Sequence, residues 1–213
     1  MACLGEAGWA TAFVGGSERE IVNALKALGN QMGRIVQGRG GSEIETIAPT
    51  TREGAYQRSL SAYHGLEPLP IHVELSHRMS PCRYVAFGCL DAGIPSVATT
   101  ILDRLKLNFS RREQALLRHA VVLVRSGRRS FYSSILPADG RFLRFDANCM
   151  EAIDSYGRAA IQVVQDHIAR SLPVQHHWRA GELLLLDNWR VLHGRASAEG
   201  SVGRRISRIL IDA

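Results

Sequence analysis

The chain has 213 residues, of which 46% are hydrophobic and 22% charged, and a net charge of +6; this composition is that of an ordinary globular domain and excludes wholesale disorder. Its longest apolar runs are far shorter than the roughly 20 residues that span a membrane, and its first residues lack the pattern of a secretory signal, so we expect a cytoplasmic protein that does not cross a membrane. The positive charge favours anionic partners, but the arginines occur in ones and twos, which favours a small carboxylate substrate over a nucleic acid.

A capping box of Ser17 and Glu20 opens the first clear element, and apolar residues at helical spacing follow it. This pattern predicts an N-terminal helix over 17–33. The glycine-rich stretch after the helix indicates loops, with one short extended piece around 44–49. The prolines at the end of 51–70 disfavour helix immediately before them.

From residue 71 the chain changes to short β-type runs separated by turn residues. Strands are expected over 71–75, 83–90, 96–102, 182–186, 189–193 and 206–211, with paired strands around an Asp-Gly turn within 128–145. A second capping box predicts a helix from Ser110, and helical spacing predicts another over 151–171. Many short strands with a few outer helices predict a mainly β fold with flanking helices, a two-sheet sandwich or jelly roll. We expect one domain over 1–213, with its core in 71–213.

His72 and Glu74 carry the most informative chemical signal. Residues i and i+2 of a strand point to the same face, so the imidazole and the carboxylate would project together as metal ligands. His193, in another predicted strand, is the candidate third ligand. Two histidines and one carboxylate leave three positions open, which suits ferrous iron that binds a co-substrate and dioxygen together. Without further signals, a solvated pair on an edge strand would be the commoner explanation.

Arg204 and Arg208 add such a signal in the last predicted strand. Residues i and i+4 share a strand face, whereas Arg205 points the other way. Two guanidinium groups on the metal side can hold a dicarboxylate through bidentate hydrogen bonds. The alternative is a solvated basic edge strand.

The order and spacing of these motifs are typical of a known family. The matching segments are Pro70-Ile71-His72-Val73-Glu74, Thr99-Thr100, the block from Gly181 to Arg195, and Arg204-Arg205-Ile206-Ser207-Arg208. From about Leu28 to its end, the sequence resembles the iron(II)/2-oxoglutarate-dependent oxygenases of the taurine dioxygenase and clavaminate synthase superfamily. The resemblance implies a double-stranded β-helix (jelly-roll) core.

The resemblance also implies the roles of individual residues. His72, Glu74 and His193 would bind Fe(II). Arg204 would pair with the distal carboxylate of 2-oxoglutarate, with Arg208 facing the same pocket. Thr100, or Thr99 if the register slips by one, would help to hold 2-oxoglutarate, and Ser61 would contact the substrate. Independently of the resemblance, the position of His77 soon after Glu74 makes it a candidate to line the pocket, with a solvent-facing strand end as the commoner explanation.

The implied reaction consumes dioxygen and 2-oxoglutarate, releases succinate and carbon dioxide, and most often hydroxylates a small polar substrate such as a free amino acid or a derivative. Desaturation and ring closure use the same ligands, whereas the glutamate at position 74 argues against a halogenase. Because the chain is short for the family, two alternatives stay open: a carrier-bound or nucleotide-linked substrate, and a jelly-roll metal-binding protein without turnover.

Other tempting residues have simpler explanations. His176-His177 is expected in a loop or on the surface, and Asp187-Asn188 is expected to form a turn that fixes local geometry. The four cysteines form no CxxC pair, so we expect reduced thiols without a zinc site or disulfides. The absence of a Gly-x-Ser-x-Gly motif disfavours hydrolase chemistry. The oligomeric state is left open.

Overall fold

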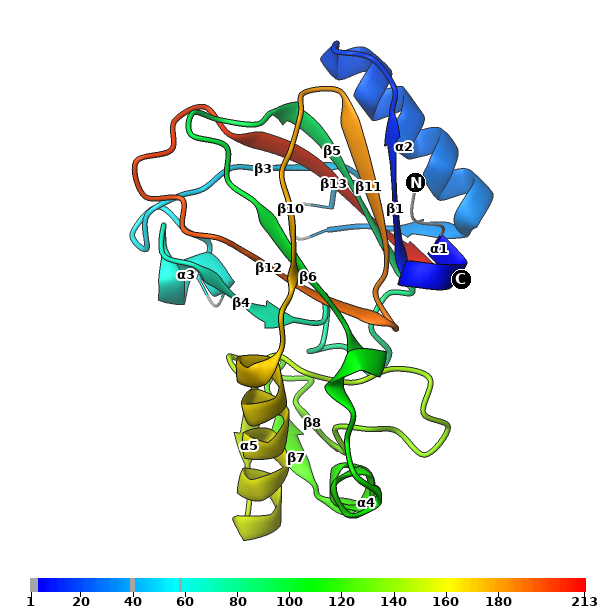
Figure 1. Ribbon diagram of the computed structural model, residues 1–213, viewed down its shortest axis with the longest axis vertical. Helices are drawn as coiled ribbons and strands as arrows, with labels where there is room; N and C mark the ends of the chain where they lie inside the picture. The colour runs from blue at the N-terminus through cyan, green and yellow to red at the C-terminus, as the bar shows by residue number, and fades with distance from the viewer. Residues whose placement is uncertain (1–3, 39–40, 58) are drawn as a thin grey trace.

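The computed structural model describes residues 4–38, 41–57 and 59–213, and two antiparallel sheets that face each other dominate it (Figure 1). The larger sheet has the order β1-β11-β5-β13-β2, with β3 also paired to β13. Its strands are β1 (Trp9–Phe13), β2 (Arg34–Val36), β3 (Glu45–Ile47), β5 (Tyr84–Asp91), β11 (Glu182–Asp187) and β13 (Arg205–Asp212). The smaller sheet has the order β10-β6-β12-β4. Its strands are β4 (Leu69–His72), β6 (Thr99–Asp103), β10 (Val174–His176) and β12 (Val191–Arg195).

Helix α2 (Glu18–Met32) covers the outer face of the larger sheet (Figure 1). It begins at the predicted capping box: the Ser17 hydroxyl accepts the Glu20 N–H, and the Glu20 carboxylate accepts the Ser17 N–H. Its buried stripe lies against β5, where a Cβ at Gly88 would stand only 2.4 Å from a methyl carbon of Ile21. The glycine therefore lets the helix approach the sheet closely.

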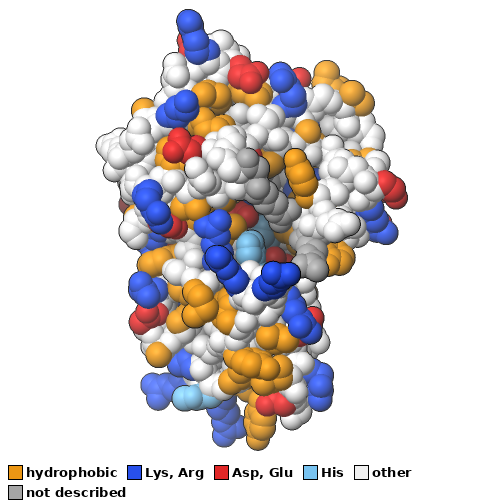
Figure 2. Space-filling view, turned by 180° about the vertical axis from the view of Figure 1, so that it is seen from behind, with side chains coloured by type: hydrophobic (Ala, Val, Ile, Leu, Met, Phe, Trp, Pro, Cys, Tyr) orange, Lys and Arg blue, Asp and Glu red, His pale blue; other side chains and the backbone are white. Residues whose placement is uncertain are grey.

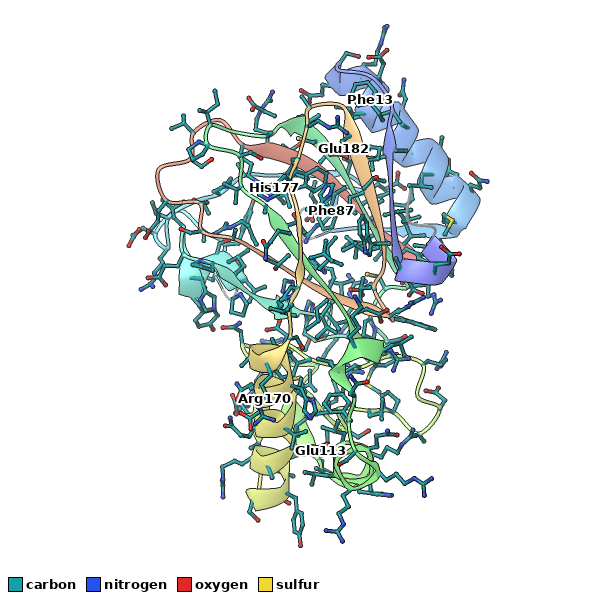
Figure 3. The ribbon with its side chains drawn as sticks, viewed as in Figure 1. Phe13, Phe87, Glu113, Arg170, His177 and Glu182 are labelled. Atoms are coloured by element: carbon teal, nitrogen blue, oxygen red, sulfur yellow. The ribbon has the colours of Figure 1, made fainter. Side chains whose placement is uncertain are left out.

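An apolar core fills the space between the two sheets. Phe87 and Leu184 of the larger sheet pack with Ile101 and Val191 of the smaller sheet and with Trp178. Figure 3 shows Phe87 between the two layers. This core isolates the inner faces of the strands from solvent, so a polar side chain that points inward lies in a region of low dielectric constant.

A second layer lies against the outer face of the smaller sheet. It contains α4 (Arg111–His119), α5 (Ser155–Arg170) and a three-stranded sheet of β7 (Val122–Val124), β8 (Phe131–Ser133) and β9 (Met150–Ala152). Its core joins Leu117 and Val164 to Leu192 of β12. His167 of α5 and Glu113 of α4 are 3.1 Å apart and connect the two helices (Figure 3). The inserted segment thus holds β12 in place through contacts on the outer face of the smaller sheet.

Several predicted elements are confirmed, and others need correction. The strand expected over 71–75 ends at His72. The paired strands expected within 128–145 are wrong: the turn exists, with Gly140 N–H donating to Pro137 O at 2.9 Å, but β8 pairs with β7. The segment after the turn carries Phe142 and Leu143 into the core instead of forming a ladder.

In the described part of the chain, eight short elements were not predicted, namely α1 (Leu4–Ala7), β1, β2, α3 (Leu60–His64), the 3-10 helix Arg104–Leu107, β7, β9 and β10. None of the helices in the described part of the chain is long and apolar enough to cross a membrane.

Candidate active site

Three metal-ligand side chains meet at the inner face of the smaller sheet. Strands β4 and β12 are antiparallel neighbours, and His72 is the direct partner of His193, with ring centroids 4.6 Å apart. Glu74 lies two residues beyond the end of β4, in a turn, and its Oε2 is 3.8 Å from His193 Nε2. One ligand atom of each residue lies within 4.8 Å of the others. The pair predicted on one strand face therefore does converge, although only His72 is in the strand.

The protonation states of these groups suit a metal ion. His72 Nδ1 donates to the Pro70 carbonyl at 2.9 Å, which leaves Nε2 with its lone pair. Burial and the neighbouring His72 lower the pKa of His193 to about 3, so its imidazole is neutral at neutral pH. Burial would raise the pKa of Glu74, but the charges of Arg208 and of nearby histidines lower it to about 2. One carboxylate and two imidazoles are the donor set of non-haem ferrous sites, so these residues fit Fe(II).

Arg208 is buried beside this set, with both ends of its guanidinium group occupied. Nη1 donates to Glu74 Oε2 at 2.7 Å, and Nη2 donates to Glu45 Oε2 at 2.5 Å. Burial would lower the pKa of Arg208, but these two carboxylates raise it. Arg208 is therefore a charge-compensated cation that ties β13 to β3 and to the turn of Glu74.

Arg204 lies just before β13, and the register shifts between Arg205 and Ile206, so the strand alternation expected from the sequence does not place it on the face of Arg208; its surroundings are also different. It is 7% exposed, and no described residue provides a hydrogen-bond partner for its Nε. Burial, together with the charge of Arg195, lowers its pKa to about 10. Arg195 is itself occupied, because it donates to the carbonyl groups of Gly65 and Glu67. Arg204 also lines a cavity of about 340 Å³ together with Asp91 and Arg205, whereas none of the three metal-ligand residues lines this cavity.

Thr99 and Thr100 point to opposite faces of β6. The strand register pairs Thr99 with Arg195, two positions from His193, so Thr99 lies on the face of the metal ligands. Its hydroxyl is buried and accepts the indole N–H of Trp178 at 3.0 Å. Thr100 pairs with Gly194 on the other face of the sheet. Its hydroxyl lies only 2.7 Å from where a Cβ atom at position 194 would be. Of the two alternatives, the geometry favours Thr99.

The tandem histidines differ in their surroundings. His177 is exposed as expected, but the expectation of a surface or loop role is wrong for His176, which is 8% exposed in β10. Its Nε2 is 3.6 Å from Oε2 of the buried Glu182. The strand pairs His176 with Thr99, and this pairing directs the ring inward. Figure 3 shows Glu182 and His177 at the end of the sheets remote from α5.

The two predicted substrate residues lie in different segments of the chain. His77 lies in the turn that follows Glu74, and its charge helps to lower the pKa of that carboxyl. Ser61 lies in the first turn of α3, and its backbone carbonyl accepts the N–H of Gly65 at 2.8 Å. A contact of Ser61 with substrate stays a prediction. Figure 2 shows a hollow on the molecular surface in which a histidine is visible between Lys and Arg side chains.

Three residues of the site region were missed as functional candidates. Glu45 was only part of an expected extended piece, and nothing in the sequence relates it to Arg208. Trp178 lies next to the tandem histidines and had no apparent partner. Asn188 was assigned only to a turn, whereas its amide contacts the backbone of Glu74. In each case the missing information was a long-range contact.

Comparison with known proteins supplies the family. The sequence profile described as "Taurine catabolism dioxygenase TauD, TfdA family" matches residues 99–210, which is more than half of the chain. The chain belongs to the TauD/TfdA family. This membership confirms the resemblance found in the sequence, and with it the assignment to the Fe(II)- and 2-oxoglutarate-dependent dioxygenases. The matched region contains His193 and both arginines, whereas His72 and Glu74 precede it. No curated protein matches the chain significantly.

Solved structures of similar fold include two non-haem iron enzymes. An asparagine oxygenase in complex with Fe(II), hydroxyasparagine and succinate matches with a TM-score of 0.74 at 15% identity, over 96% of this chain and 74% of that one. The iron oxygenase OrfP with Fe and α-ketoglutaric acid matches with a TM-score of 0.77 at 16% identity, over 96% and 74%. These matches show that this member of the TauD/TfdA family shares their β-rich fold.

Proposed function

We propose that this TauD/TfdA dioxygenase binds Fe(II) through His72, Glu74 and His193 and hydroxylates a free amino acid or a close derivative. The convergence of two imidazoles and one ionised carboxylate at one point carries the proposal. The guanidinium group of Arg204 supports it, since this buried cation has no carboxylate partner among the described residues and is suited to an incoming anion.

The chain's own residues position the reactants. Arg204 binds the distal carboxylate of 2-oxoglutarate through its planar fork, and the Thr99 hydroxyl donates to the same ligand because its oxygen already accepts from Trp178. The apolar core around Phe87 excludes water from the inner side of the site. When bound, ferrous iron with 2-oxoglutarate supplies dioxygen activation and oxygen transfer to a C–H bond, with succinate and carbon dioxide as co-products.

The substrate class follows from the charges near the ligand set. Arg208 and Glu45 form an ion pair whose side chains are 18% and 19% exposed; because Arg208 is already paired with two carboxylates, a substrate on this side would meet a polar wall of paired charges and not a free cation. A zwitterion complements both charges, whereas a lipid complements neither. The asparagine oxygenase and OrfP structures, which hold hydroxyasparagine and hydroxyarginine products, support the same class. Ser61 and His77 are proposed to line this side.

We also propose that the two facing sheets are the halves of a double-stranded β-helix, and that residues 1–213 form a single oxygenase domain. The shared apolar core, to which strands of both sheets contribute, supports this description. The insertion between β6 and β10 packs on the outside of the smaller sheet, which keeps the inner face available for the site.

The test is anaerobic titration of the apoprotein with Fe(II) and 2-oxoglutarate, followed by succinate assays with a panel of amino acids. We expect the weak visible charge-transfer band of the chelate, and succinate release that one or more amino acids stimulate. His193→Ala should abolish both and retain the fold, whereas the exposed His177→Ala serves as the matched control. Iron binding by His193→Ala equal to that of the parent would refute the triad.

Two other outcomes separate the alternatives. Metal and 2-oxoglutarate binding without succinate formation from any substrate would indicate a metal-binding protein without turnover. If only carrier-bound or nucleotide-linked substrates stimulate succinate release, such a substrate replaces the free amino acid in the proposal.

A further inference from the structure

Glu74 is held in an unusual way for a residue so close to a strand. Its strand, β4, ends at His72, and the backbone of Leu75 adopts a φ of +58°. A positive φ is costly for a residue with a branched side chain, of the order of 1–3 kcal/mol, and persists only where surrounding contacts impose it. The backbone of Glu74 therefore leaves the sheet ladder, and some other group must fix it.

That group is the side chain of Asn188. Its Oδ1 accepts the Glu74 N–H at 2.9 Å, and its Nδ2 donates to the Glu74 carbonyl at 3.0 Å. The same Nδ2 donates to the carbonyl of Cys82 at 2.8 Å. A single amide thus exchanges with Glu74 the two hydrogen bonds that an antiparallel neighbour strand would exchange. Asn188 is fully buried, so water does not compete for these bonds.

The position of Asn188 connects the two halves of the ligand set. It lies in the turn between β11 and β12, and the same short β12 carries His193. Its backbone N–H donates to Arg83 O at 3.0 Å, which anchors the turn to the segment before β5. Asn188 therefore links the backbone of Glu74 to the turn that leads into the strand of His193, whereas Arg208 contacts the carboxylate itself.

We propose that Asn188 is a positioning residue that holds Glu74 in the geometry needed for metal binding. The proposal rests on the proposed function, because it assumes that Glu74 is a ligand. Asn188 touches neither metal nor substrate, and it acts by aligning the peptide from which the carboxylate projects. Partners of this kind typically change metal affinity 10–100-fold when they are removed.

The turn after Glu74 is fixed separately by Arg144. Its guanidinium group donates to the carbonyls of Ser76, Arg78 and Met79. Because these contacts remain when Asn188 is replaced, the loop as a whole should stay in place and only the peptide of Glu74 should loosen. This expectation separates a positioning role from general unfolding of the loop.

The experiment is titration of the apoprotein variants with Fe(II) under anaerobic conditions and with Co(II), together with thermal unfolding. Asn188→Ala should weaken metal binding about 10–100-fold. The matched control is Asp187→Ala in the same turn, where Asp187 accepts the Trp189 N–H and pairs with Arg83 but does not contact Glu74. It should lower Tm and leave metal affinity nearly unchanged.

If Asn188→Ala does not fold, Asn188→Asp provides a second variant with which to test the proposal. The ionised aspartate still accepts the Glu74 N–H but cannot donate to the two carbonyls; because burial favours the protonated acid, which can donate to one carbonyl, metal affinity is measured over a range of pH in which the aspartate ionises. Its added negative charge would by itself attract a divalent cation, so weaker metal binding in this variant can come only from altered geometry. Metal affinity equal to that of the parent in Asn188→Asp, with intact folding, would overturn the proposal.

A double variant distinguishes the role of Asn188 from that of Glu74. Glu74→Ala alone should weaken metal binding, and adding Asn188→Ala should cause no further loss, because no carboxylate remains to be positioned. If Glu74→Ala leaves metal affinity unchanged, the proposed triad fails. If Glu74→Ala weakens binding and the second substitution weakens it again by the same factor as in the parent, only the positioning role fails.

Discussion

Replacement of Arg204 by methionine should make the protein more stable while removing co-substrate binding. Arg204 is buried next to Arg195, and these surroundings lower its pKa from its ordinary value to about 10. At 1.36 kcal/mol for each pKa unit, the charged side chain costs the folded state about 3 kcal/mol at neutral pH. The sign follows because a base with a lowered pKa is charged more readily in the unfolded chain. Arg204→Met should therefore stabilise the apoprotein by up to about 3 kcal/mol, or raise Tm by up to about 10 °C for a chain of this size.

The same variant should lose 2-oxoglutarate. A hydrogen bond to a charged group contributes about 1.5–3 kcal/mol, so loss of the guanidinium fork should weaken binding by at least about tenfold, and by more than 100-fold if both bonds contribute. The assay combines thermal unfolding of apoprotein with calorimetric titration of 2-oxoglutarate into the metal-loaded protein.

Arg208→Met is the control with the opposite expected sign for stability. It leaves the carboxylates of Glu45 and Glu74 buried without their shared cation, which should lower Tm. The reasoning is refuted if Arg204→Met lowers Tm as much as Arg208→Met does, or if it binds 2-oxoglutarate with the affinity of the parent.

Three further predictions concern single contacts. Trp178→Phe keeps the ring but removes the indole N–H, so KM for 2-oxoglutarate should rise about 3–10-fold, and a Thr99→Val background should abolish this effect. Hydrogen bonds from the α4 N-cap and from His167 of α5 lower the pKa of Glu113 to about 2. The ionised carboxylate therefore stabilises the fold fully above pH 4.5, and this contribution is lost as the pH falls toward 2. Glu113→Gln should lower Tm at pH 7 but not at pH 2. Gly88→Ala should destabilise by about 1–3 kcal/mol in denaturant titration, since the new methyl group meets α2; an unchanged midpoint would contradict that close approach.

Signals contained in a few consecutive residues predicted their elements well. The capping boxes before α2 and α4 are formed as expected, and the apolar run before His193 is a buried strand. The ligand set was also accessible, because two of its members are close in sequence and the distal block is distinctive. These features depend on local propensity and strand periodicity, which a single sequence expresses directly.

Contacts between distant segments were not accessible in this way. The choice between Thr99 and Thr100 depends on the register of β6 against β12, and a shift of one residue reverses every side chain. The strand that contains Phe131, β8, pairs with β7, which precedes it in the chain, and Phe142 is buried in the core instead of pairing with β8. The burial of His176 likewise follows from strand pairing that its own neighbours in sequence do not encode.

The direct pairing of β4 with β12 has a consequence for how the protein folds. His72 and His193 are neighbours in the sheet although more than half of the chain separates them, and β1 near the N-terminus pairs with β11. Pairings of such high contact order carry a large loop-closure entropy and form slowly. The ligands therefore come together only after most of the chain has been ordered, and metal cannot nucleate the process. In a refolding experiment, the recovery of metal affinity should consequently lag behind the recovery of helical signal, and it reports the closure of the two sheets.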